Sequence, residues 1–109
     1  MTETKDIIIT KGDTLSFALE FEGLDQELTN VYFSCKEETS SKVYIFQKSL
    51  QNGVTKINNS TYRVRVAPED TKNIESGSYF YDLQISANGD VFTILKGKFI
   101  VEYEITEES

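Results

Sequence analysis

The amino-acid sequence predicts a single all-β domain over residues 1–109, built as an antiparallel β-sandwich of about seven or eight strands. Composition is the first observation: 28 residues are Val, Ile or Thr, 13 are Phe or Tyr, and only three are Ala. β-Branched and aromatic side chains fit a pleated sheet. The second observation is that runs of period-two alternation recur along the chain. The third is that turn residues separate these runs every ~8–12 positions, a spacing typical of sandwiches.

In the first half of the chain, strands are expected over 6–10, 14–21, 31–36 and 43–50. The clearest alternation is in 14–21, where apolar positions take every second place: Leu15, Phe17, Leu19 and Phe21. Asp13 follows Gly12 between the first two strands, and Asp side chains bond their own backbone in turns. We therefore expect a structural role for Asp13.

In the second half, strands are expected over 54–57, 62–66, 78–86, 91–95 and 98–105. The pairs Asn52-Gly53 and Asn88-Gly89 each predict a two-residue hairpin turn, because both residue types tolerate positive φ. Gly97 separates the last two runs, and we expect it to mark a bulge or bend within one long strand.

One segment, residues 67–77, breaks the strand pattern and predicts a short helical turn near 68–75. Pro68 suits the first helical position, and Glu69 and Asp70 suit the positive N-terminal end of a helix. Gly77 suits the residue after the C-terminus of the helix. Beyond the sandwich, residues 1–5 and 106–109 are expected to be flexible tails.

Charge and composition exclude several classes of protein. The chain has no His, one Cys and a net charge of −7, so His-based catalysis, an intramolecular disulfide and a multi-thiolate zinc site are excluded. The acidity argues against nucleic acid and anionic membrane surfaces as partners. Neither a signal-peptide pattern nor a long apolar run is present. We predict a protein that is not an enzyme, with no catalytic residue, cofactor or metal site.

A few polar side chains are candidates for chemical sites. Glu69 and Asp70 could hold Ca²⁺ through oxygen ligands, although helix capping explains them better. Asp82 could pair with Arg63 or Arg65 across strands. Cys35 shares the apolar face of its strand, where a buried thiol acts as a small hydrophobic group.

Tyr79 and Tyr81 make the fold prediction more specific. Tyr79 opens the strand after the helical turn, where immunoglobulin-type domains place a tyrosine whose hydroxyl bonds back to the preceding connection. Tyr81 then falls where antibody domains carry a cysteine of the inter-sheet disulfide. The sequence therefore predicts an immunoglobulin-like sandwich in which an aromatic ring replaces that cysteine.

Three stretches carry a resemblance to a known family, over nearly the whole chain: 7–14 (IIITKGDT), 68–83 (PEDT leading into GSYFYDL) and 88–99 (NGDVFTILKGKF). In that order they resemble small phage and prophage virion proteins, including the N-terminal immunoglobulin-like domains of baseplate upper proteins. The resemblance implies a non-enzymatic structural or adaptor protein of a virion, in the baseplate, tail or head. It would be made in the bacterial cytoplasm and would contact other virion proteins and copies of itself.

Five residues are candidates for an interface because they lie opposite the more obvious core residues of their strands: Tyr32, Tyr44, Phe80, Phe92 and Ile100. Exposed together, they would form an apolar patch typical of a protein interface; if both faces of their strands are buried, they belong to the core instead. A free edge strand could also add a partner strand. The alternative hypothesis is a carbohydrate-binding or adhesion module, in which exposed rings stack on sugars; the absence of Trp disfavours it.

Overall fold

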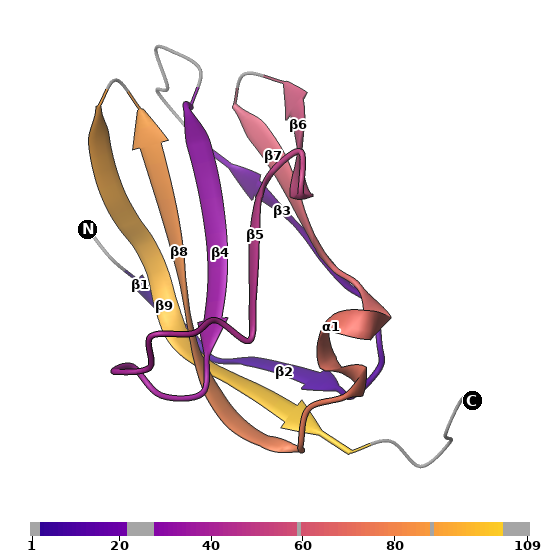
Figure 1. Ribbon diagram of the computed structural model, residues 1–109. Coiled ribbons are helices and arrows are strands. Elements are labelled where there is room, and N and C mark those ends of the chain that lie inside the picture. The colour runs from indigo at the N-terminus through magenta and orange to yellow at the C-terminus, as the bar shows by residue number, and fades with distance from the viewer. Residues whose placement is uncertain (1–2, 22–27, 59, 88, 104–109) are drawn as a thin grey trace.

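The computed structural model describes residues 3–21, 28–58, 60–87 and 89–103 (Figure 1). Within these ranges the chain forms nine strands and one short helix. In chain order they are β1 (Glu3–Thr4), β2 (Ile7–Thr10), β3 (Leu15–Glu20), β4 (Asn30–Lys36), β5 (Phe46–Leu50), β6 (Gly53–Asn58), β7 (Thr61–Val66), α1 (Pro68–Lys72), β8 (Gly77–Ala87) and β9 (Asp90–Glu102).

Hydrogen-bonded strands follow one path, β1-β9-β8-β4-β5-β6-β7-β3, with β2 also paired to β9. The path folds over between β5 and β6, so two layers face each other (Figure 1). We call β1, β2, β9, β8, β4 and β5 sheet I, and β6, β7 and β3 sheet II. Most pairs are antiparallel; β1 and β2 run parallel to β9, and β5 runs parallel to β6 over two residue pairs.

This strand order is that of an immunoglobulin-like sandwich in which one strand, β5, is added to the sheet of β9, β8 and β4. The neighbours β9, β8, β4 and β5 correspond to the sheet that carries an extra hairpin strand in variable domains, and β6, β7 and β3 to the opposing sheet. The predicted fold class, an all-β immunoglobulin-like sandwich with a short helical turn, is confirmed.

A cluster of aromatic rings joins the two sheets. The ring of Phe33 in β4 is fully buried, and its centroid lies 5.4–6.3 Å from those of Phe17, Phe46, Tyr81 and Phe99. Phe17 belongs to sheet II and the other four to sheet I. Such tilted and edge-on pairs add about 0.5–1.5 kcal/mol each beyond the area that they bury.

Cys35 lies two residues from Phe33 on the same inward face and is fully buried. Burial raises the pKa of its thiol to about 12, so the group is a neutral thiol near pH 7 and not a reactive thiolate. It packs as a small hydrophobic side chain, as the sequence predicted.

Tyr79 makes the hydrogen bond that the sequence predicted for it. Its hydroxyl donates to the backbone carbonyl of Glu75, four residues upstream. The Tyr79 side chain is buried. This contact is the tyrosine corner of immunoglobulin-type domains, and it fixes where β8 enters sheet I.

Helix α1 begins at Pro68, as predicted, but ends at Lys72. Asp70 holds its first turn: one carboxylate oxygen accepts from the Ala67 backbone N–H at 2.7 Å and lies 2.8 Å from Lys48 Nζ. The prediction that Gly77 follows the helix C-terminus is wrong, because Asn73 follows the helix and Gly77 opens β8. The Lys48–Asp70 ion pair ties α1 to sheet I.

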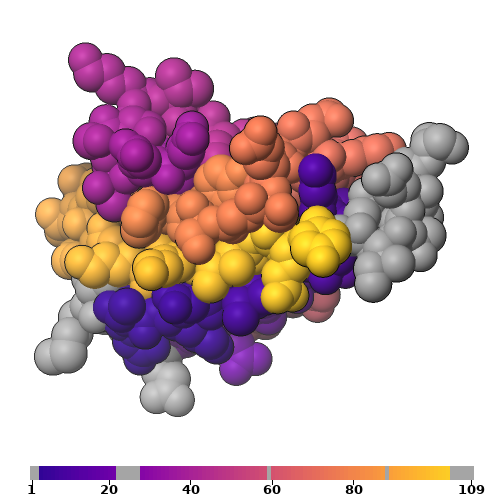
Figure 2. Space-filling model, turned by 90° about the horizontal axis from the view of Figure 1, so that it is seen from below, coloured from indigo at the N-terminus to yellow at the C-terminus, as the bar shows by residue number. Residues whose placement is uncertain are grey.

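The N-terminal segment is not a tail from Glu3 onward. β1 and β2 lie along β9, as the indigo and yellow surfaces in Figure 2 show. Lys5 N–H donates to the Lys96 carbonyl at 2.9 Å, and Lys98 N–H donates to Asp6 Oδ1 at 3.0 Å. Ile9 of β2 is buried in the core. The other expected tail, 106–109, lies outside the described residues.

Gly97 lies within one long strand, as predicted, but the bulge of that strand is not at Gly97. The extra residue is Ile94, because Leu83 pairs with Leu95 and the next residue, Gln84, pairs with Thr93. A Cβ atom on Gly97 would lie 2.2 Å from the Lys5 carbonyl oxygen. Glycine is therefore required because another backbone crosses close to the strand.

The crossing segment is also held by Tyr81, which pairs with Gly97 across β8 and β9. The Tyr81 hydroxyl donates to the same Lys5 carbonyl. Burial raises the pKa of this hydroxyl to about 12, and the nearby Asp6 carboxylate adds to the shift. The hydroxyl thus stays a hydrogen-bond donor throughout the physiological pH range.

Two further expectations fail where the chain changes sheet. Asn52-Gly53 does not close a hairpin: β5 and β6 run parallel, and the tight turn lies at Leu50-Gln51, with Gln51 at φ 68°. The strand expected over 43–50 begins only at Phe46. By contrast, Ala87 pairs with Asp90 as the predicted β8–β9 hairpin requires; Asn88 itself lies outside the described residues.

No helix in the described ranges is long and apolar enough to cross a membrane.

Replacing Gly97 with alanine should lower the free energy of unfolding by about 1–3 kcal/mol, because the new methyl group forces the Lys5 backbone away from β9. Urea unfolding of Gly97→Ala, of the control variant Lys98→Ala and of the unchanged protein measures the free energy of unfolding. The control substitution is at the next, exposed position of the same strand and should stay within about 0.5 kcal/mol of the unchanged protein. Equal stability of Gly97→Ala and the unchanged protein would contradict the close crossing.

Candidate functional site

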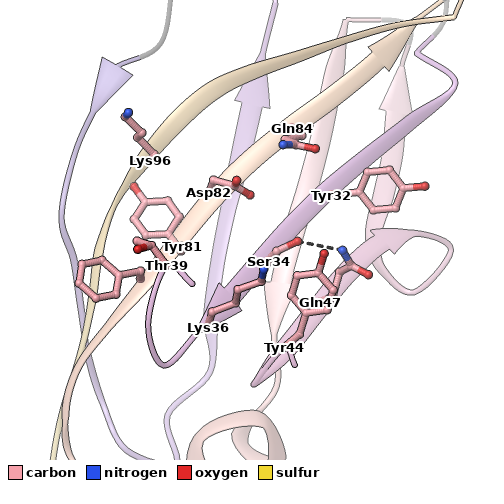
Figure 3. A pocket seen from close by; sticks show the side chains of 11 residues that line it. Tyr32, Ser34, Lys36, Thr39, Tyr44, Gln47, Tyr81, Asp82, Gln84 and Lys96 are labelled. Carbon is pink, nitrogen blue, oxygen red and sulfur yellow. Dashed lines mark hydrogen bonds between the residues drawn. The ribbon is translucent and has the colours of Figure 1, made fainter. Parts of the chain in front are cut away.

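A hollow of about 490 Å³ lies on the outer face of sheet I, and we call it the outer hollow (Figure 3). Its lining comes from β4, β8 and β9, from β5 and from the segment between β4 and β5: Tyr32, Ser34, Lys36, Thr39, Tyr44, Gln47, Phe80, Tyr81, Asp82, Gln84 and Lys96. It is open on one side, so it suits a group presented by a larger molecule.

Strand alternation places these side chains. In β4, Phe33 and Cys35 face the core, so their neighbours Tyr32, Ser34 and Lys36 face outward. The antiparallel register then sets Ser34 opposite Asp82 and Tyr32 opposite Gln84. The packing of the core therefore determines which polar groups share the hollow.

Hydrogen bonds hold several of the polar groups in the hollow. Gln47 Nε2 donates to Ser34 Oγ at 3.0 Å, the contact drawn in Figure 3. Gln84 Nε2 donates to Thr93 Oγ1 at 3.2 Å. Tyr32 Oη accepts from Asn30 Nδ2 at 3.1 Å. The side-chain oxygens of Gln47 and Gln84 stay directed by these bonds and can accept hydrogen bonds from a bound molecule.

Asp82 supplies the one carboxylate of the hollow's lining. It is half-buried between Ser34 of β4 and Lys96 of β9, its partners in register. Burial raises the pKa of this carboxyl group above its ordinary value, and the nearby Lys36 ammonium offsets part of the shift. The predicted pairing of Asp82 with Arg63 or Arg65 is wrong, because both arginines lie on β7 in the other sheet.

Aromatic side chains border the polar groups. Tyr32, Tyr44 and Phe80 all line the hollow, so three of the five predicted interface residues come together. Tyr44 is 45% exposed, and Lys36 Nζ lies 5.0 Å from the centre of its ring. A cation over a ring at this distance is attracted by the π-electrons, which orients both side chains at the rim.

Phe92 and Ile100 do not join this group. Phe92 lies opposite Ile85, which faces the core, so Phe92 is on the inner side of sheet I at its open end and is 53% exposed. Its predicted outward position is wrong. The extra residue at Ile94 shifts the alternation of faces, so that Phe92 faces the same inner side as Leu95. Ile100 does face outward, but its neighbours are Ser78 and Ile8, away from the hollow.

A second, smaller hollow of about 260 Å³ extends the first toward the N-terminal segment. The two share Thr39, Phe80, Tyr81 and Lys96. The second is lined in addition by Thr4, Asp6, Gly97 and Lys98. Together they make a continuous depression across β4, β8, β9 and the segment beside β1, with lysines on its β9 side.

The other carboxylates considered from the sequence do not converge here. Asp70 is committed to Lys48 and Ala67, Glu69 is exposed at the start of α1, and Asp13 lies in the turn after β2. Within the described ranges, no three His, Cys, Asp or Glu side chains gather where they could hold a metal ion. The carboxylates that line the depression are Asp82 in the outer hollow and Asp6 in the second hollow.

Sequence reasoning missed Gln47, Lys96 and Ser34 as partners of the aromatic residues. Each occupies an outward position, and the alternation of Phe33 with Ser34 carries that signal. Which residues of separate strands become neighbours depends on strand order and register, and the bulge at Ile94 changes that register within β9. The sequence therefore predicted which residues of each strand face outward, but not which outward residues of different strands are neighbours.

A scan against protein-family models finds no match, and a search of curated proteins finds none either. Among solved structures, the immunoglobulin-like domain of mouse leukocyte-associated immunoglobulin-like receptor 1, crystallised as a strand-swapped dimer, is 10% identical; the match covers 88% of this chain and 86% of that chain at a TM-score of 0.54. The extracellular domain of the voltage-gated sodium channel β4 subunit is 10% identical, with 96% of each chain covered and a TM-score of 0.49. At such identity the likeness shows the fold alone, an immunoglobulin-like sandwich.

Replacing Asp82 with asparagine should raise the free energy of unfolding at pH 7 by up to about 1 kcal/mol, a small gain because water screens this half-buried group. Burial raises the folded-state pKa of Asp82, so the charged form is disfavoured in the folded chain. Burial of the charged carboxylate therefore lowers the stability of the fold at pH values above the folded-state pKa. This loss disappears below the unfolded-state pKa, where Asp82 is protonated in both the folded and the unfolded chain. Denaturant unfolding of the variant and the unchanged protein at pH 7 and at pH 3 measures the difference in stability with Asp82 charged and with Asp82 protonated.

The matched control is Asp90→Asn, at an exposed carboxylate in the first residue of β9. It should change stability little at either pH. A loss of stability in Asp82→Asn at pH 7 would contradict the assignment, because it would mean that partners stabilise the charged carboxylate more than burial destabilises it.

Proposed function

We propose that the chain is a non-enzymatic structural or adaptor protein of a phage or prophage virion, and that it binds a partner protein through the outer hollow. The observation that carries the binding role is the gathering of Tyr32, Tyr44 and Phe80 around Ser34 and Asp82 on one open face. The virion setting, with synthesis in the bacterial cytoplasm, rests on the sequence resemblance described above.

The composition of the hollow supports protein binding. Tyrosine and phenylalanine are enriched in the cores of protein interfaces, because a large rigid ring buries much area at little entropic cost. The carboxyl, amide and hydroxyl groups around the rings can fix the orientation of a partner. A depression that extends over the second hollow offers room for a partner's loop or strand, not merely for a small ligand.

We propose that the chain also binds copies of itself, in addition to other virion proteins. The mouse receptor domain that shares the fold was crystallised as a strand-swapped dimer, which illustrates how such a sandwich exchanges or adds strands. Oligomers of identical chains usually close through rotational symmetry, and virion assemblies are built from symmetric rings.

Particles induced from the bacterium that carries the gene provide the direct test. In purified particles, quantitative mass spectrometry should detect the chain at a fixed ratio to the major virion proteins. Tyr44→Ala should reduce that ratio at least about tenfold, as expected for loss of an aromatic interface residue. Tyr103→Ala, which removes a ring that is 74% exposed elsewhere, should leave the ratio unchanged.

Two results would contradict the proposal in different ways. Absence of the unchanged chain from purified particles would overturn the virion role. Equal incorporation of Tyr44→Ala and the unchanged chain would retain the virion role and overturn the outer hollow as the docking surface.

Carbohydrate binding is the second candidate, because rings beside hydrogen-bonding groups are also what a sugar requires. Tyr32, Tyr44 and Phe80 could stack on a pyranose while Asp82 and Gln84 bond its hydroxyls. A ligand that binds the folded state raises the melting temperature. A glycan-dependent rise that Tyr44→Ala abolishes would favour this function over protein docking.

A further inference from the structure

A different surface, the free edge of β3, carries an inference independent of the outer hollow. Among the described residues β3 pairs with β7 alone, along all six of its positions. The N-terminal strands, which could have covered its other side, lie on β9 in the opposite sheet. One row of backbone N–H and C=O groups of β3 therefore has no strand of the described ranges beside it.

The inward side chains of β3 are incompletely covered. Leu15, Phe17 and Leu19 face the core yet remain only half-buried. Their neighbours on β7, Tyr62, Val64 and Val66, are fully buried. Among the described residues, the inner face of sheet II is therefore less covered at β3 than at β7.

β3 has few of the usual protections of a free edge, with Glu20 as its one charged side chain. Natural sheets discourage pairing with prolines, lysines, bulges or very short edge strands. β3 is six residues long, pairs regularly with β7, and contains neither proline nor lysine. Its outward side chains are Ser16, Ala18 and Glu20, two of which are small.

We propose that the free edge of β3 pairs with β3 of a second copy of this chain, antiparallel and about a twofold axis at Ala18. Sheet II would then continue from one copy into the other. The partner that β3 needs must bring apolar side chains on the inner face and small or complementary groups on the outer face, and β3 itself meets both requirements.

The inner face supports this register. With Ala18 opposite its own copy, Phe17 of each chain lies opposite Leu19 of the other, because antiparallel partners share a face. The half-buried apolar row of one copy thus covers that of the second copy. Both rows also continue the apolar core of their own sandwich.

Charges on the outer face support the same register. Within one chain Arg65 lies opposite Ser16, and Glu20 lies at the other end of β3. The twofold axis places Glu20 of one copy opposite Ser16 of the second copy, one strand away from the second copy's Arg65. Strands are about 4.8 Å apart, so these two long side chains can meet across Ser16, once on each side of the axis.

Light scattering of the untagged protein after size exclusion, over a concentration series, tests this pairing. A reversible dimer with twice the 12.4 kDa chain mass is expected. Glu20→Arg should weaken dimerisation about tenfold or more, because two attractive contacts become repulsive. Arg65→Glu should do the same, and the double variant should recover to within about threefold of the unchanged protein. Glu102→Arg, an equal charge change in sheet I, should have no effect.

Any of three results would overturn the pairing: a monomer at every concentration, a dimer indifferent to Glu20→Arg, or a dimer that dissociates on Tyr44→Ala instead. All the substituted side chains are exposed, and circular dichroism verifies that each variant is folded. Incorporation into particles is measured separately through Tyr44, so failure of β3 pairing is distinguishable from failure of the proposed virion function.

Discussion

Contact between aromatic rings is the interaction on which the rest of the molecule depends. In immunoglobulin domains of antibodies, a disulfide joins the two sheets and packs against a buried tryptophan. This chain has a single cysteine, and it is free. Phe17 of sheet II and Tyr81 of sheet I instead contact the same ring, Phe33, with centroids 5.5 and 5.4 Å away. The rings thus link the two sheets without a covalent bond.

The same cluster fixes the outer surface. Phe33 and Leu83 point inward, so the alternation of side chains along a strand makes Ser34 and Asp82 point outward. The β4–β8 register then places Ser34 opposite Asp82. Tyr81 serves both sides of this arrangement: its ring packs on Phe33, and its hydroxyl holds the N-terminal segment at Lys5. Residues that stabilise the sandwich therefore also shape the depression proposed to bind a partner.

Local patterns predicted what depends on neighbours in sequence. The tyrosine corner, the start of α1 at Pro68 and the inward faces of β3 and β7 all follow from short-range chemistry. Gly97 shows the limit, because a glycine in a strand signals either a bulge or a close backbone approach. Choosing between them requires the Lys5 crossing, which is 92 residues away. Phe92 was placed on the wrong face for a related reason: a single-residue bulge at Ile94 changes the alternation.

The central claim is that the rings around Phe33 replace the inter-sheet disulfide. Equilibrium urea unfolding of Phe33→Ala tests it most directly. The account predicts a loss of about 3–5 kcal/mol, a large share of the ~5–15 kcal/mol stability of a typical domain, and the same stability of the unchanged protein with and without reductant. A loss below about 1 kcal/mol would show that the two sheets are held together by something other than this cluster, and would contradict the account.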